Sequence, residues 1–387
     1  MRIFQRFDRW VQDGPFTAED LGLYRIIYAV SVLLVAPDIT WLAQYPNFMF
    51  HPPPGPLQLL SGFPSLPVLI GLEVLRSVIL VMLGLGIWTK YVSLAAWLTL
   101  SATYGVTFCL GKIDHTILLT LPPLVLAFAN WGNRYSLDAL RRSNESSAQP
   151  QWPLRLLALL IGWGFFAAAL TKALTGWLSF SSQASRGYFV LGFVTQGRTH
   201  WLAQWVAEHD VLAAWEAVDW LTVAFELSIL IALPWWRAFR ITLAVAATFH
   251  LVVLLIMNID FSNAVVAYGA FVSWGAIARR IGNSRVGRHG LRALEARRAL
   301  LEGGGGRVLL ALVAVAVGAG SWFLMVSPAG SISTGPIGGH LIIGIGAVIG
   351  LTYLLREARS TLAGDARTAP SQEDTGARGS ERPVGRR

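Results

Sequence analysis

Long apolar runs alternate with short polar segments along this chain. A membrane-spanning helix needs about 20 mostly apolar residues, and about ten runs approach that length. We expect transmembrane helices at Leu21–Gln44, Leu66–Ile87, Tyr91–Leu110, Ile113–Asn130, Leu154–Leu174, Trp215–Leu233, Ala238–Met257, Phe261–Ala278, Val308–Met325 and Gly339–Leu355. The pattern predicts an all-α, polytopic integral membrane protein with about ten transmembrane helices.

The polar segments divide the chain into four parts. Residues 1–278 hold eight predicted helices, 279–306 a basic cytoplasmic loop with a glycine linker, and 307–356 two additional transmembrane helices. Residues 357–387 are rich in polar residues and Gly, so we expect a disordered cytoplasmic tail. Within the first part, the Trp-containing segment Trp177–Ala214 favours interfacial or re-entrant helices.

Composition and charge agree with a multi-pass protein of the cell membrane. The chain is 54% hydrophobic and 14% charged, whereas soluble domains carry about 25% charged residues. Of its 31 Lys and Arg residues, 24 fall in segments that this topology places inside and three in segments placed outside. Under the positive-inside rule both termini are cytoplasmic. Topology also explains the net charge of +9, so we expect the lipid bilayer, and no nucleic acid, as a partner.

Ionisable residues at membrane depth mark the candidate chemistry, because burying each one costs about 2.5–3.5 kcal/mol on insertion scales. The topology places Asp114, His115 and Lys172 at outer helix ends, and His250 about two turns below the outer surface. Glu226 lies near the middle of its helix. Acid, imidazole and amine groups from several helices thus share the outer half of the protein.

Structural roles remain open for these residues. Lys172 is also compatible with a lysine that extends to the outer interface, and Asp114–His115 with a helix N-terminal cap. His250 fits a packed, hydrogen-bonded histidine, and Glu226 a neutral structural carboxyl. The single cysteine, Cys109, excludes an intrachain disulfide and a structural zinc site of several cysteines, and we expect no metal.

Two further groups of charges invite a structural interpretation. Glu73 and Arg76 are three residues apart on one predicted helix, a spacing that favours mutual neutralisation. Arg25 is close enough in sequence to pair with Asp20, or to reach the headgroups at the inner helix end. The chain carries no phosphate-binding loop and no soluble-enzyme motif of the HExxH, GxSxG or CxxC type.

Four short blocks resemble the HTTM domain, a membrane module related to vitamin K-dependent gamma-carboxylase. They cover roughly residues 20–278, the predicted eight-helix core. The blocks are Asp20-Leu-Gly-Leu-Tyr-Arg-Ile-Ile-Tyr, Asp114-His115-Thr-Ile-Leu-Leu with Tyr135-Ser-Leu-Asp-Ala139, Phe165-Phe-Ala-Ala-Ala-Leu-Thr-Lys172 with Gly176-Trp177, and Phe249-His250 with Phe261.

The resemblance implies a quinol-dependent chemistry and a lyase activity. In the carboxylase, a lysine at a helix end deprotonates vitamin K hydroquinone, and Lys172 matches that lysine by its spacing to Trp177. His115 and His250 match histidines of the family pattern, and His115 corresponds to one that stabilises the reacting anion. Asp114, Glu226 and Trp177 are then candidate cofactor-binding residues at an outward-facing site for a reduced quinone, vitamin K hydroquinone or menaquinol.

The chain also departs from the carboxylase. Asp114 stands where the animal enzyme has Asn, and two predicted helices replace the large soluble region that holds protein substrates. Two functions therefore stay open: a quinol-dependent oxygenase or carboxylase, and a non-catalytic membrane protein for maturation or export of a secreted peptide, similar to sporulation-delaying protein B. In the second case a secreted peptide or protein would bind Trp177–Ala214. A small-solute transporter ranks behind both, because no inverted repeat is apparent.

Overall fold

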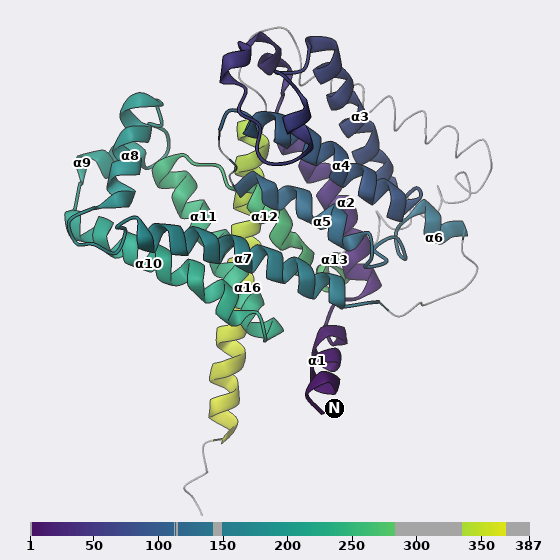
Figure 1. The fold of residues 1–387 in the computed structure, drawn as a ribbon. Coiled ribbons are helices and arrows are strands. Elements are labelled where there is room, and N and C mark those ends of the chain that lie inside the picture. Colours follow the sequence, from purple (N-terminus) through teal and green to yellow (C-terminus); the bar gives the residue numbers. More distant parts are fainter. Residues whose placement is uncertain (1, 112, 114, 142–148, 283–334, 369–387) are drawn as a thin grey trace, which may run out of the picture.

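The computed structural model describes residues 2–111, 113, 115–141, 149–282 and 335–368, and these residues form an all-helical protein (Figure 1). The expected helix Val308–Met325, and Asp114, lie outside the described residues. The elements are α1(Arg2–Gln12), α2(Ala18–Val35), η1(Thr40–Gln44), η2(Asn47–Met49), η3(Pro56–Leu59), α3(Leu66–Leu85), α4(Thr89–Phe108), η4(His115–Thr120), α5(Leu121–Leu126), α6(Leu137–Arg141), α7(Trp152–Leu174), α8(Ala184–Thr195), α9(Ala203–Glu208), α10(Leu212–Ala232), α11(Trp236–Met257), α12(Ser262–Tyr268), η5(Gly269–Phe271), α13(Trp274–Gly282) and α16(Gly335–Thr368).

Five described segments are long and apolar enough to cross a membrane: Ala18–Gln44, Leu66–Leu85, Trp152–Leu174, Trp236–Met257 and Ile337–Leu362. Two more expected helices form at full length, α4 with 20 residues and α10 with 21. Neither is among the five. Four Ser and Thr residues break the apolar character of the second half of α4, and three acids lie along α10.

Two expected membrane helices are broken into shorter pieces. The stretch Ile113–Asn130 forms η4 and the six-residue α5, because Pro122 and Pro123 lack backbone N–H groups and begin a new helix rather than continue one. The stretch Phe261–Ala278 forms α12, η5 and α13, with an extended residue at Val272. Asp20 holds this second break, since its carboxylate accepts a hydrogen bond from the backbone N–H of Gly275 (2.8 Å).

Helix α2 lies at the centre of the main hydrophobic core. Tyr24 and Tyr28 are fully buried and pack against the Trp131 ring at 6.2 and 6.1 Å between centroids. Their hydroxyls donate to the backbone carbonyls of Val266 (3.0 Å) and Leu119 (2.5 Å). Because those two carbonyls belong to α12 and η4, α2 ties both short elements to the core.

Helix α16 runs antiparallel to α11 and packs through small residues (Figure 1). A Cβ on Gly350 would lie 2.8 Å from the Ala244 carbonyl oxygen, and a Cβ on Gly346 would collide with Val265. Such close approach by small residues drives helix association in membranes. The helix continues to Thr368, so residues 357–368 are helical rather than disordered; Arg237 holds this end through an ion pair with Glu357 and a hydrogen bond to Thr361.

The segment Trp177–Ala214 carries two short helices, α8 and α9. Asp210 accepts hydrogen bonds from Arg186 and from the Trp215 indole (2.8 Å), and the bonds lower the pKa of the Asp210 carboxyl. The Leu202 backbone N–H donates to the Leu255 carbonyl (2.9 Å). The segment is therefore a folded platform that rests on the C-terminal end of α11.

Candidate functional site

Lys172 and Glu226 form an ion pair between α7 and α10. Only 22% of the lysine side chain and 8% of the glutamate side chain are exposed. The Lys172 ammonium also lies over the Trp177 ring, 5.2 Å from its centroid. The structure thus brings together three of the residues expected at a quinone site.

The register of α7 and α10 shows that Lys172 turns inward. Gly162 on α7 packs against Leu230 on α10, so a residue-for-residue count places Lys172 opposite Trp220 in this antiparallel pair. Its side chain instead reaches Glu226, about 9 Å further into the pair at 1.5 Å per residue. The alternative of a lysine extending to the interface does not match this geometry.

A second polar pair lies between α11 and α12. Nε2 of His250 shares a hydrogen bond with the Tyr268 hydroxyl at 2.9 Å, and both side chains are buried. His250 also stacks against Phe261 at 4.5 Å between ring centroids, with 11° between the ring planes. Tyr268 was not among the expected site residues. The sequence shows a tyrosine in an apolar run, and only the turn between α11 and α12 brings it to the histidine.

His115 also packs against the Phe261 ring. The two ring centroids are 4.3 Å apart, and Nε2 of His115 is 3.1 Å from the backbone carbonyl oxygen of Asp260. Both histidines therefore contact Phe261, in the turn that leads into α12. The expected partner Asp114 lies outside the described residues, so the structure gives it no place in the site.

Phe165 connects the two polar pairs. It is seven residues before Lys172, which places both on one face of α7. Its ring centroid is 6.4 Å from that of His250 and 6.3 Å from that of Tyr268. Phe165 also contacts Phe225, the residue before Glu226 on α10, at 6.2 Å between ring centroids. The five residues expected by sequence that the structure describes thus form one elongated site, with Phe165 and Tyr268 as additions.

Two buried polar atoms of this site have no hydrogen-bond partner among the described residues: Oε2 of Glu226 and Nδ1 of His250. An unsatisfied buried polar atom costs about 1–3 kcal/mol, so native proteins keep few of them. One carboxylate oxygen and one imidazole nitrogen thus remain available to bind a ligand with hydroxyl or carbonyl groups. No group of three or more His, Cys, Asp or Glu residues in the described part of the chain is arranged to hold a metal.

Three further buried charges, Arg25, Glu73 and Arg76, each bond to a backbone group. Glu73 accepts from the Ile39 backbone N–H (2.6 Å) and Arg76 donates to the Pro37 carbonyl (3.2 Å), so both hold the chain that follows α2. Arg25 is fully buried and donates to the Tyr135 carbonyl (2.5 Å), neither to Asp20 nor toward the headgroups. These contacts assign Arg25, Glu73 and Arg76 to the scaffold.

Comparison with known proteins gives a family. No curated protein and no solved structure matches the chain significantly. A family model described as the HTTM domain matches residues 14–270, more than half of the chain, and this range contains every residue of the site. The chain therefore belongs to the HTTM-domain family, whose name is consistent with a relation to vitamin K-dependent gamma-carboxylase.

Proposed function

We propose that this protein is a membrane enzyme that uses a reduced quinone, and that Lys172 and Glu226 act together as its base. The observation that carries the proposal is the buried Lys172–Glu226 pair, which leaves one carboxylate oxygen free beside the ammonium. A purely structural ion pair in an apolar protein gains most when every lone pair is satisfied. The unsatisfied oxygen instead favours a site that a ligand completes.

The residues present fit the polar ring of a quinol. Oε2 of Glu226 accepts a hydrogen bond from a hydroxyl, and Nδ1 of His250 accepts or donates according to its tautomer. Phe165 provides an aromatic face on the same side of α7 as Lys172, and Trp177, which follows the helix, provides another beside the Lys172 ammonium. A bound reduced quinone would supply an ionisable ring hydroxyl and the electrons for reaction with dioxygen.

The chain's own contribution is the control of a proton. Transfer of one proton from Nζ of Lys172 to Glu226 turns the ion pair into a neutral amine and a neutral carboxylic acid. The amine nitrogen then has a free electron pair and accepts a proton from a nearby hydroxyl, as a general base must. The resulting ammonium and the imidazole of His250 stabilise a neighbouring oxyanion in a site shielded from water.

Quinone binding and turnover by the purified full chain test this proposal. Menaquinol is added to the protein in nanodiscs, and wild type is compared with Lys172→Met, Glu226→Gln and Lys90→Met. Lys90 is a matched control, because its ammonium also lies over an aromatic ring, Phe128, at 5.5 Å. We expect the first two variants to lose quinol-dependent oxygen consumption by about 100-fold or more, and Lys90→Met to retain it.

Equal turnover in wild type and Lys172→Met would refute the proposed base. If wild type binds no quinone, a role in maturation or export of a secreted peptide becomes the better proposal. One observation favours that second function: the α8–α9 platform exposes Tyr188, Val194 and Trp205, each more than half exposed. These side chains are suited to bind a peptide or the bilayer surface.

A further inference from the structure

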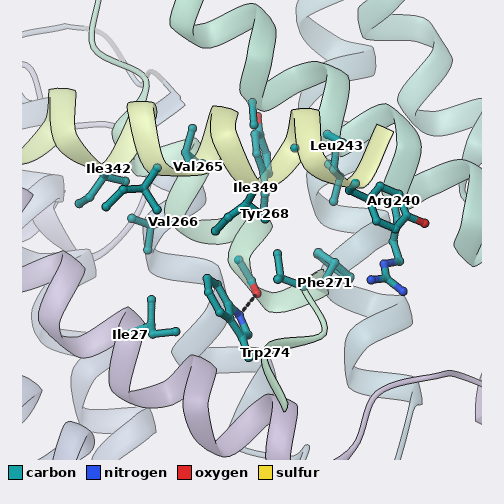
Figure 2. A pocket seen from close by; sticks show the side chains of 18 of the residues that line it. Ile27, Arg240, Leu243, Val265, Val266, Tyr268, Phe271, Trp274, Ile342 and Ile349 are labelled. Atoms are coloured by element: carbon teal, nitrogen blue, oxygen red, sulfur yellow. Dashed lines mark hydrogen bonds between the residues drawn. The ribbon is translucent and has the colours of Figure 1, made fainter. Parts of the chain in front are cut away.

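A cavity of about 190 Å³ lies between α2, α11, α12 and α16 (Figure 2). Its walls are mostly apolar, and branched aliphatic side chains such as Ile27, Leu243, Val265, Ile342 and Ile349 form a large part of them. Apolar cavities of this size stay dry and bind apolar molecules. The cavity is therefore suited to a hydrocarbon chain rather than to water.

Helix α16 forms one wall of the cavity, and part of this wall is also on the surface of the helix bundle. Ile345 lines it and is 51% exposed. The helices around it include three of the segments long and apolar enough to span a membrane. In a bilayer, the exposed face of α16 contacts lipid, so a lipid chain that enters the cavity between α16 and its neighbours does not cross water.

Arg240 is the cationic group at one end of this cavity (Figure 2). Its guanidinium donates to the Ser273 hydroxyl (3.0 Å) and lies over the Tyr353 ring, 4.9 Å from the centroid. The nearby carboxylate of Glu357 forms its ion pair with Arg237. Within the described residues, Arg240 has no ion pair, so this end of the cavity carries a net positive charge.

We propose that the cavity binds one acyl chain of an anionic phospholipid, with the lipid phosphate on Arg240. The apolar walls take the chain, and the guanidinium forms charge-assisted hydrogen bonds with phosphate oxygens. Ser273 and Tyr353 hold the guanidinium at this end of the cavity. An uncharged chain, such as an isoprenoid tail, fills the same walls and leaves Arg240 without an anion. Charge complementarity therefore selects the phospholipid.

Native mass spectrometry of the delipidated full chain tests the site. Phosphatidylglycerol and phosphatidylcholine with identical acyl chains are added in turn to wild type and to Arg240→Gln. We expect wild type to prefer phosphatidylglycerol by about fivefold, the contribution of one arginine near a membrane surface. We expect Arg240→Gln to lose the preference.

Arg279→Gln is the matched control. It removes the same charge from an exposed arginine paired with Glu19, on a helix whose Trp274 alone lines the cavity. Binding of phosphatidylglycerol should be unchanged in this variant. An equal loss in both variants would show that only net charge matters and would overturn the proposal.

A second variant tests the acyl chain. Ala247 lines the cavity and is buried, so Ala247→Leu places a larger side chain inside it. We expect this variant to bind less of both lipids while thermal unfolding without lipid stays at or above the wild-type temperature. Unchanged lipid binding in Ala247→Leu, or displacement of phosphatidylglycerol by menaquinone in wild type, would contradict the assignment.

Discussion

Burying Lys172 or Glu226 alone would cost free energy, and each charge compensates the other. Removing one partner of a buried pair leaves an uncompensated charge, whereas removing both leaves neutral groups of similar shape. The pair is therefore best tested with both single substitutions and the double substitution.

We expect Lys172→Met to lower the free energy of unfolding in detergent by about 3 kcal/mol, because it leaves the Glu226 carboxylate alone. Glu226→Gln should also destabilise. The double variant should recover most of the loss, which gives a coupling energy well above 1 kcal/mol in a double-mutant cycle. Lys90→Met should change stability by less than about 0.5 kcal/mol. Additive single effects would argue against a coupled pair.

The position of these charged residues in apolar runs made each of them predictable from the sequence. The residues that they contact were not predictable in this way. The cost of charge in an apolar run singles out Lys172, Glu226 and His250 in the sequence alone. Tyr268 gives no such signal, since a tyrosine among apolar residues is ordinary. Arg25 was placed wrongly for a related reason: its partner, the Tyr135 carbonyl, is a backbone atom more than 100 residues away.

At the scale of elements, α16 packs closely against its neighbours at glycines, where there is no room for a side chain. We expect Gly350→Ala to cost about 1–3 kcal/mol by overpacking, because its Cβ would lie 2.8 Å from the Ala244 carbonyl oxygen. Gly344 lies on the same helix with open space around it. Gly344→Ala should be neutral or stabilising by up to about 1 kcal/mol. Thermal unfolding of both variants makes the comparison, and equal effects would refute this packing.

The α8–α9 platform should weaken in acid. Hydrogen bonds from Arg186 and Trp215 lower the pKa of Asp210 in the folded state. A carboxyl whose pKa is lower in the folded state than in the unfolded state stabilises the fold at pH values above its unfolded-state pKa. This stabilisation is lost as the pH falls through the folded-state pKa. We expect wild type to be more stable than Asp210→Asn at neutral pH. The difference should shrink below about pH 4, as followed by thermal unfolding. A difference independent of pH would exclude this carboxylate as the cause.

Apolar runs predicted where helices lie but not where they break. The expected helices Ile113–Asn130 and Phe261–Ala278 both have enough apolar residues to span a bilayer. The first is interrupted by two prolines visible in the sequence. The second is interrupted at two tertiary hydrogen bonds, one from the Gly275 N–H to Asp20 and one from the Trp274 indole to the Gly269 carbonyl (2.7 Å). The local sequence pattern does not predict either contact.

For the whole molecule, charge bias predicts which end faces the cytoplasm. The start of α9 lies near the C-terminal end of α11, because the Leu202 backbone N–H donates to the Leu255 carbonyl. The last turns of α16 lie near the N-terminal end of α11, because Glu357 forms an ion pair with Arg237. These two regions are thus at opposite ends of one membrane-spanning helix.

Cysteine labelling in intact cells tests this topology. In a Cys109→Ser background, we expect a membrane-impermeant maleimide to label Glu208→Cys directly. Arg359→Cys should be labelled only after the membrane is permeabilised, because the positive-inside rule places it in the cytoplasm. Both native residues are exposed, so access to the side chain does not bias the comparison. The reverse labelling pattern would invert the orientation.

Tyr268 is part of both the cavity and the polar site. Its ring lines the cavity beneath α16, and its hydroxyl shares a hydrogen bond with His250 in the polar site. A molecule that shifts this ring also shifts the bond to the histidine. Thermodynamic reciprocity then applies: by whatever factor a molecule in the cavity changes affinity at the polar site, a ligand there changes the affinity of the cavity by the same factor.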